Sequence, residues 1–295
     1  LKYLAYFQEN DLVAAASQTD AKGDRSKRPS EQDDPDMYLH VVERRDDGVI
    51  VSGAKLHNTM APYSDELLVF TTRALAKHEQ DYAIAFAIPA DAEGIYMIGR
   101  QAFAPERQPN LAAPYPKLAD IESMTVFDRV FVPNERIFLN GETDMGGQLA
   151  LTFALYHRHS YCGCKPGVAD VMLGLTALLA DYNGVEKKDN VRATFADMIS
   201  VAELVFAAGI ASGVKSFNAP SGTQVPNIIY ANVGRRHAGH NMYHEYECLC
   251  DVAGGLPATL PLTPEYNHPV VGDFVRKYVK RRADVPEENH YRAYH

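Results

Sequence analysis

Residues 156–167, YHRHSYCGCKPG, place many reactive side chains in one short stretch. Histidine nitrogen and cysteine sulfur are common ligands of zinc, copper and iron–sulfur clusters. Cys164 follows His157 by seven residues, so on a helix the two side chains differ by only about 20° around the axis. They can supply two metal ligands but cannot complete a four-ligand site alone. The alternative is a polar helix end that carries a buried thiol.

The neighbouring side chains extend this helical face. Tyr161 lies four residues after His157 and shares its face, whereas Lys165 lies at the edge, roughly 80° away. Cys162 points to another side of the helix. Pro166 has no amide hydrogen for the carbonyl of Cys162, so we expect a kink at that position.

A second C-x-C pair, Cys248 and Cys250, has a different geometry. On a helix these residues differ by about 200° and face opposite ways. We therefore interpret both as small buried hydrophobic residues. The same geometry argues against a structural zinc site built from the two C-x-C pairs. The absence of a secretion signal in the sequence favours reduced thiols and a cytoplasmic protein.

Composition narrows the class of protein. The chain has 295 residues, a hydrophobic fraction of 46% and a net charge of −9. The acidic balance argues against nucleic acid as a partner, because phosphate binding requires a basic surface. No long run of uncharged apolar residues is present, so we expect no membrane span. The first residue is not methionine, and we expect the chain to be a fragment or a processed form of a longer protein.

The periodicity of apolar residues divides the chain into two parts. Residues 12 to about 138 contain short alternating segments rich in Val, Ile, Phe and Tyr, and RDDG at residues 45–48 is a hairpin signal. From about residue 146, apolar residues recur every three or four positions. The sequence therefore predicts an α+β protein, with an antiparallel β-barrel or sandwich at 1–145 followed by an all-α helical bundle at 146–295.

Three segments resemble a known family. Residues 17–59, 127–138 and 156–174 are similar to the 4-hydroxybutyryl-CoA dehydratase (vinylacetyl-CoA isomerase) branch of the 4-hydroxyphenylacetate 3-hydroxylase superfamily. The first two segments are shared with flavin monooxygenases and indicate the fold. The third is specific, since His157 and Cys164 match a histidine and a cysteine that bind a 4Fe–4S cluster in the dehydratases.

The resemblance implies an acyl-CoA dehydrogenase-like fold and a homotetramer. That fold has an N-terminal helical domain, a middle β domain and a C-terminal bundle, and this sequence matches the last two. We therefore expect the N-terminal helical domain to be absent from this chain, together with the cysteine pair that supplies the other two cluster ligands. A family glutamate near the active site would lie beyond His295.

The resemblance also implies an FAD site at two strand ends. A flavin needs a flat slot and hydrogen bonds from backbone and hydroxyl groups. The segments SQTD and GAKLHNT offer such groups, and the residues carried over from the family are Gln18, Thr19, His57, Asn58 and Thr59. The alternative is ordinary polarity of strand ends and turns.

The implied reaction is radical dehydration of 4-hydroxybutyryl-CoA to crotonyl-CoA, with vinylacetyl-CoA isomerisation, using FAD and the cluster. His157 and Cys164 would bind the cluster, and His157 could also act as a base. Tyr161 would hydrogen-bond the substrate or the leaving oxygen, and Lys165 would stabilise negative charge. Glu122 is a candidate proton carrier, or else a solvated carboxylate. The alternatives are an FAD-dependent aromatic hydroxylase of the 4-hydroxyphenylacetate 3-monooxygenase type and an inactive truncated subunit.

Overall fold

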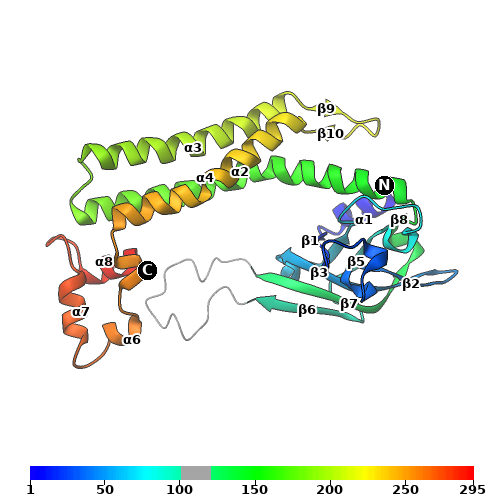
Figure 1. The fold of residues 1–295 in the computed structure, drawn as a ribbon, viewed down its shortest axis with the longest axis horizontal. Helices are drawn as coiled ribbons and strands as arrows, with labels where there is room; N and C mark the ends of the chain where they lie inside the picture. Colours follow the sequence, from blue (N-terminus) through cyan, green and yellow to red (C-terminus); the bar gives the residue numbers. More distant parts are fainter. Residues whose placement is uncertain (101–120) are drawn as a thin grey trace. The chain divides into compact units, whose positions relative to one another are not determined.

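The computed structural model describes residues 1–100 and 121–295. These residues divide into two compact units (Figure 1). One unit contains residues 1–100 and 121–152, and the other contains residues 153–295. Helix α2, Thr143–Asn183, contributes to both units, and the predicted boundary at residue 145 lies inside this helix.

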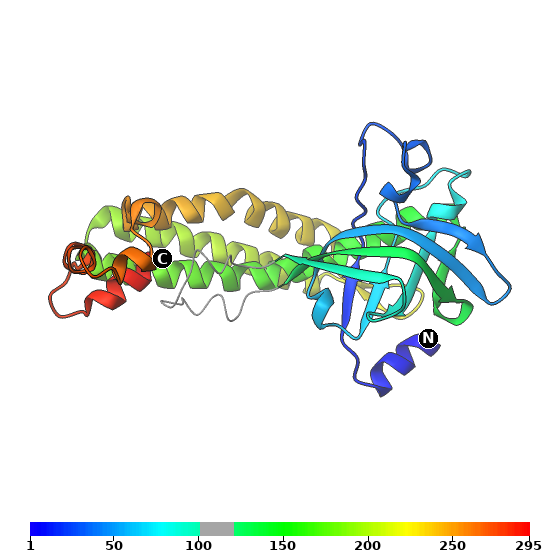
Figure 2. The same cartoon turned by 90° about the horizontal axis from the view of Figure 1, so that it is seen from below.

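Two four-stranded sheets form the first unit (Figure 2). The strands of the first sheet, in spatial order, are β1 (Ala14–Ser17), β4 (Glu66–Val69), β5 (Ile84–Pro89) and β8 (Ile137–Asn140). The strands of the second sheet, in spatial order, are β2 (His40–Arg44), β3 (Gly48–Thr59), β7 (Glu122–Pro133) and β6 (Ile95–Arg100). A short helix, α1 (Lys2–Glu9), precedes the first strand.

Both sheets bury side chains in one apolar core. Phe86 from one sheet and Phe127 from the other meet edge to face, with ring centroids 6.1 Å apart. Neither sheet closes on itself among the described strands, so the unit is a sandwich and not a closed barrel. The prediction of a wholly antiparallel unit is wrong at β1, which pairs in parallel with β4. The long intervening segment, which contains β2 and β3, provides the crossover that a parallel pair requires.

Several local predictions are confirmed and others need correction. The predicted hairpin joins β2 and β3, and the amide of Arg45 donates to the carbonyl of Gly48 at 2.8 Å. The two strands expected between residues 121 and 133 are one strand, β7. Arg129 adopts a positive φ of 54° within it. Helix α1 and strand β8 were not predicted, because each is too short to show a clear period.

Three long helices lie side by side in the second unit (Figures 1 and 2). They are α2, α3 (Asp189–Val214) and α4 (Ile228–Ala253). The small hairpin of β9 (Phe217–Asn218) and β10 (Gln224–Val225) lies at one end of α3 and α4. At the other end are the short helices α5 (Leu256–Thr259), α6 (Thr263–Tyr266), α7 (Gly272–Val279) and α8 (Glu287–Tyr294).

The helix predictions are confirmed in type and corrected in length. Helix α2 is one helix that continues through Pro166, the position at which the sequence predicted a kink. Buried residues on both sides of the proline, such as Cys162 and Ala169, tie the helix to the bundle and offset the lost hydrogen bond. Helices α2 and α4 end just before Gly184 and Gly254, which adopt positive φ of 68° and 76°.

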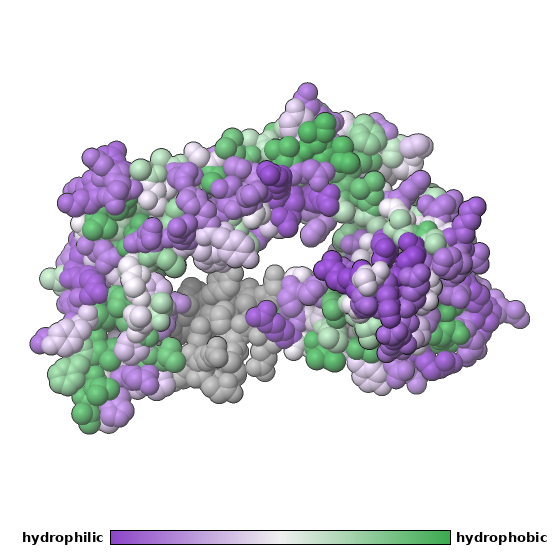
Figure 3. Space-filling view, viewed as in Figure 1, coloured by the Kyte–Doolittle hydropathy of each residue, from purple (hydrophilic) through white to green (hydrophobic). Residues whose placement is uncertain are grey.

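By length and composition, α2 and α3 each contain a window apolar enough to cross a membrane. Only 28% and 22% of these windows are buried in the structure. Figure 3 shows exposed apolar residues among polar ones over the helical unit. One or two such helices are weak evidence for a membrane span, because the core helix of a soluble protein passes the same composition test.

Candidate functional site

The two strand ends predicted to bind a flavin lie next to each other in the first unit. The amide of Leu56 donates to the carbonyl of Thr19 at 2.6 Å, and Asp20 forms an isolated bridge with Lys55. Immediately after Lys55 the pairing of β3 with β7 shifts register, and His57 adopts a positive φ of 60°. The bulge therefore brings GAKLHNT beside SQTD.

The predicted side chains at this edge have different environments. His57 and Thr59 are exposed, and Gln18 is partly exposed. Asn58 is fully buried, and its Nδ2 donates to the carbonyl of Lys55 at 3.0 Å and to Thr125 Oγ1 at 2.8 Å. These bonds fix the bulge, which is a structural role that the sequence did not indicate. The Oδ1 of Asn58 has no partner among the described residues.

The structure joins two site residues that the sequence proposed separately. Thr59 pairs with Glu122 across β3 and β7, and Thr59 Oγ1 donates to Glu122 Oε1 at 2.6 Å. The second carboxylate oxygen, Oε2, is buried and has no hydrogen-bond partner in the described part of the chain. Glu122 thus has one oxygen fixed by Thr59 and one oxygen available for a further donor.

A buried ion pair under these strand ends was missed. Lys55 Nζ lies 2.7 Å from Asp20 Oδ1, and the two side chains are 2% and 4% exposed. The same ammonium donates to the carbonyls of Gln18 at 3.0 Å and Phe70 at 2.8 Å. Burial lowers the pKa of Lys55, and the carboxylate of Asp20 opposes that shift. Lys55 points to the same buried side of β3 as Val49 and Val51. A lysine at an alternating position otherwise filled by buried valines is the sequence signal that could have predicted this ion pair.

On α2, His157 and Cys164 are both exposed, two turns apart on one face of the helix. The imidazole of His157 stacks on Phe153, with ring centroids 5.8 Å apart and an interplanar angle of 8°. The Sγ of Cys164 is 3.6 Å from the carbonyl of Tyr161. Within the described ranges, neither residue belongs to a cluster of three potential ligands. Their assignment as metal ligands stays a prediction.

Two cations flank Tyr161. The guanidinium of Arg235, on α4, lies 4.3 Å from the ring centroid, and Lys165 Nζ lies 5.1 Å from it. Lys165 is also 4.0 Å from the sulfur of Met242. Tyr161 and Lys165 were predicted as site residues, whereas Arg235 was not, since its proximity depends on how α4 packs against α2. The group can bind an anion, because two positive charges converge beside a hydroxyl-bearing ring.

The burial of the remaining cysteines depends on which side of the helix each one faces. Cys162 is buried, and it packs so closely against α3 and α4 that a Cβ on Gly234 would lie 2.5 Å from its sulfur. Burial raises the pKa of the Cys162 thiol. Cys248 is buried and Cys250 is exposed. The prediction that both were buried is therefore wrong for Cys250, whose opposite phase on α4 places it on the outer side.

Taken together, the fold and these residues define an α+β protein with candidate cofactor-binding groups at the strand ends of a sandwich and on a bundle helix. Sequence profiles identify the family. The profile of the N-terminal part of 4-hydroxyphenylacetate 3-hydroxylase matches residues 1–139, and that of the C-terminal part matches residues 147–295. The chain belongs to the 4-hydroxyphenylacetate 3-hydroxylase family.

Individual relatives refine this position. The chain is 39% identical, over 94% of its length, to a 4-hydroxybutyryl-CoA dehydratase/vinylacetyl-CoA-Δ-isomerase of Clostridium aminobutyricum. It superimposes with a TM-score of 0.94, at 36% identity over 99% of the chain, on an oxygen-tolerant archaeal 4-hydroxybutyryl-CoA dehydratase from N. maritimus. The oxygenase component of 4-hydroxyphenylacetate 3-monooxygenase, solved with FAD, shares the fold with a TM-score of 0.85 at 24% identity. The chain spans 59%, 59% and 61% of these proteins, respectively.

Proposed function

We propose that this chain is part of an enzyme that dehydrates 4-hydroxybutyryl-CoA to crotonyl-CoA and isomerises vinylacetyl-CoA. One observation carries the proposal. His157 and Cys164 are exposed on one face of α2, in a chain similar over nearly all its length to dehydratases of this type. The proposed assembly is a cytoplasmic homotetramer with an acyl-CoA dehydrogenase-like architecture. Residues 1–145 would bind the flavin, and residues 146–295 would carry the cluster ligands and the contacts between subunits.

The strand ends of the sandwich fit an FAD. Gln18, Thr19, His57 and Thr59 offer hydrogen-bonding groups at a sheet edge, where the bulge keeps them partly or fully exposed. The orphaned oxygens of Asn58 and Glu122 lie in the same region and can accept hydrogen bonds. When bound, FAD supplies oxidation and reduction of the substrate at carbon.

His157 and Cys164 fit two of the four ligands of a 4Fe–4S cluster. Imidazole nitrogen and thiolate sulfur are suitable donors, and both side chains are exposed. The described residues offer no third ligand beside them, so the proposal requires further thiolates from outside this chain. When bound, the cluster supplies a Lewis acid for the leaving hydroxyl.

The chain's own residues would manage charge and protons. The C2 proton of the substrate is acidified by the thioester, and His157 would accept it on the ring nitrogen that is free once His157 is released from iron. Lys165 and Arg235 would stabilise the resulting negative charge, since both cations already lie beside Tyr161. The hydroxyl of Tyr161 would donate to the leaving oxygen. Glu122 would carry a proton on Oε2, the oxygen that Thr59 leaves available.

The test is the iron, sulfide and flavin content per chain of the protein purified without oxygen from its full-length gene. We expect about four irons and one FAD. Cys164→Ser should lose iron and dehydratase activity but retain FAD. The matched control is Cys250→Ser, which removes another exposed thiol of the bundle. This variant should retain iron, FAD and dehydratase activity. Full iron content and activity in Cys164→Ser would contradict the proposal.

An FAD-dependent aromatic hydroxylase is the second candidate, favoured by the family profiles and by the shared fold with the oxygenase component. FAD without iron, together with hydroxylation of a phenol by reduced flavin and oxygen, would support it. A protein with neither iron nor flavin would instead be an inactive subunit.

A further inference from the structure

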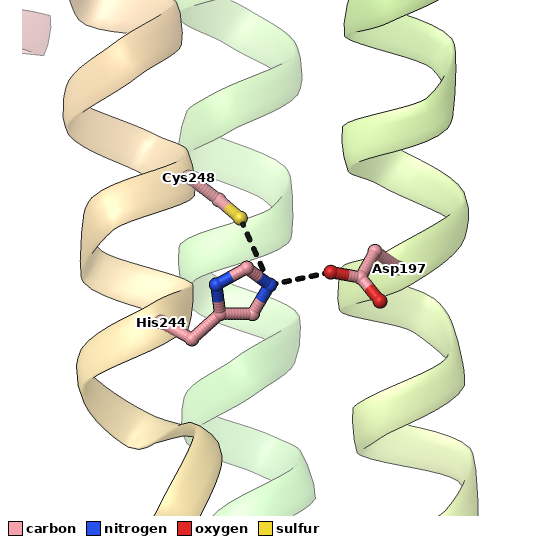
Figure 4. A group of neighbouring side chains, drawn as sticks. All are labelled: Asp197, His244 and Cys248. Atoms are coloured by element: carbon pink, nitrogen blue, oxygen red, sulfur yellow. Dashed lines mark hydrogen bonds and ion pairs between the residues drawn. The ribbon is translucent and has the colours of Figure 1, made fainter.

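A cluster outside the proposed catalytic groups joins two helices of the bundle. Asp197 comes from α3, and His244 and Cys248 lie one turn apart on α4 (Figure 4). Their ligand atoms all lie within 4.8 Å of one another. The (i, i+4) spacing places the imidazole and the sulfur on one face of α4, and the carboxylate approaches that face from the neighbouring helix.

Both partners converge on the same ring nitrogen of His244. Its Nε2 contacts Asp197 Oδ2 and lies 3.6 Å from Cys248 Sγ (Figure 4). A catalytic cysteine–histidine–aspartate relay uses opposite ring nitrogens, one for the thiol and one for the carboxylate. One nitrogen carries at most one hydrogen and cannot bond both partners well. The arrangement is instead that of three ligand atoms grouped around a common point.

The surroundings favour a cation at that point. The other ring nitrogen, Nδ1, lies 3.7 Å from Glu247 Oε2, an ion-pair distance that is too long for a hydrogen bond. The carboxylates of Asp197, Glu247 and Asp251 lie near enough to the buried Cys248 thiol to act on it electrostatically. The same negative charges attract a cation, which would in turn stabilise the thiolate.

Access and burial are consistent with an ion entering from solvent. The side chains of Asp197 and His244 are 56% and 40% exposed, whereas Cys248 is buried between the helices beside Met172 and Met198. The sulfur therefore lies at the base of the site and the oxygen and nitrogen at its rim. A mixed set of nitrogen, sulfur and oxygen donors suits zinc better than magnesium or calcium, which prefer oxygen ligands alone.

We propose that Asp197, His244 and Cys248 bind a zinc-class divalent metal ion that cross-links α3 and α4, with a fourth coordination position open to water. On binding, the thiol proton of Cys248 and any proton on His244 Nε2 are released to solvent, with no redox change. The site is separate in sequence from His157 and Cys164 and does not depend on the proposed dehydratase activity.

The test uses the reduced full-length protein, purified without oxygen so that its iron stays in place and then freed of divalent metal with a chelator. This protein is titrated with Co²⁺, followed by competition with Zn²⁺. We expect a thiolate-to-cobalt charge-transfer band in wild type that Zn²⁺ abolishes. Cys248→Ser should lose the band, and Asp197→Asn should weaken Co²⁺ binding. Removal of a ligand atom should lower the affinity for Co²⁺ by more than about 10–100-fold, which is the decrease typical when only a supporting group is removed. Cys250→Ser, which removes an exposed thiol elsewhere on α4, should retain the band.

Thermal unfolding of the same proteins separates metal binding from folding. Zn²⁺ should raise the Tm of wild type and Cys250→Ser but not that of Cys248→Ser, while the metal-free proteins unfold at similar temperatures. If Cys248→Ser does not fold, His244→Gln, at a more exposed position, replaces it in both measurements. A band that survives in Cys248→Ser or in this substitute, or no band in wild type, would overturn the proposal. In either case the contacts among Asp197, His244 and Cys248 would be hydrogen bonds and ion pairs without a metal ion.

Discussion

Lys55 carries a charge in the interior of the sandwich, where a lone ammonium would be strongly destabilising. All three of its donors are used, by Asp20 and by the carbonyls of Gln18 and Phe70. Asp20 also accepts from the amide of Leu39 at 3.1 Å. The pair therefore ties the end of β1 to β3, directly beneath the proposed flavin-binding groups.

Replacement of Lys55 tests this role. Lys55→Met should lower the free energy of unfolding by about 3–5 kcal/mol, because Asp20 would remain as an uncompensated buried charge. The double variant Lys55→Met/Asp20→Asn should recover part of the loss. Urea denaturation measures both, with Lys77→Met at an exposed position as the control. A loss below about 1 kcal/mol in Lys55→Met would show that the pair does not hold the sandwich together.

Among the elements, α2 packs closely on α3 and α4 because two glycines leave room for Cys162. A Cβ on Gly234 would lie 2.5 Å from the sulfur of Cys162 and 3.0 Å from the Cβ of Ala208. A Cβ on Gly209 would lie 2.9 Å from the Cβ of Cys162. The small residues of these helices thus determine how near their axes can approach.

Gly234→Ala should destabilise the protein by about 1–3 kcal/mol through overpacking, partly offset by the higher helix propensity of alanine. Gly174→Ala is the matched control, since nothing lies within 4 Å of its added Cβ on α2, and it should be neutral or stabilising. Chemical denaturation measures both, and Cys162→Ala combined with Gly234→Ala should restore stability. Equal effects of the two glycine substitutions would contradict close packing at Cys162.

Helix α8 docks through a buried histidine. His290 is fully buried, its Nε2 accepts from the amide of Arg282 at 3.3 Å, and its ring lies 4.7 Å from that of Tyr182. Burial lowers the pKa of His290, and the charges of Lys280, Arg281 and Arg282 lower it further. The neutral imidazole is therefore the form that the folded protein prefers.

Acidification should weaken this docking. The unfolded chain binds a proton near its ordinary pKa of about 6.5 while the folded His290 does not, so stability is present above that pH and is lost below it. The contribution of one such group changes by at most about 1.4 kcal/mol per pH unit. His290→Gln should show a shallower loss than wild type in urea denaturation between about pH 7.5 and 5. His240→Gln, at an exposed position on α4, should not.

For the whole molecule, the long helices expose an apolar surface. Ile199, Phe206 and Ile210 lie on one face of α3, at 45%, 49% and 55% exposure. A surface of this kind usually marks an interface between subunits or domains. It supports the proposed homotetramer, and it explains why α3 resembles a membrane span by composition alone.

Phe206→Glu should shift the full-length protein to a smaller oligomer, because the interface would bury a charge. Light scattering after size-exclusion chromatography measures the mass. The control, Lys187→Glu, changes the charge of an exposed residue outside α3 and should leave the mass unchanged. An unaltered mass in Phe206→Glu would place the subunit interface on another surface.

The sequence by itself determined the features that depend on neighbours along the chain. The order of β and α parts, the β2–β3 hairpin, the helix ends at Gly184 and Gly254 and the opposite phases within each C-x-C pair all follow from steric preference and periodicity. The family resemblance came from contiguous segments in the same way.

Only the tertiary structure decided which distant residues meet. It paired β1 with β4 in parallel, buried Lys55 on Asp20, placed Glu122 beside Thr59 and brought Asp197 to His244 and Cys248. Each contact joins segments that are far apart in the chain, and its formation depends on the packing of whole sheets and helices. Local periodicity indicates which face of an element is buried but carries no information about which other element will cover that face.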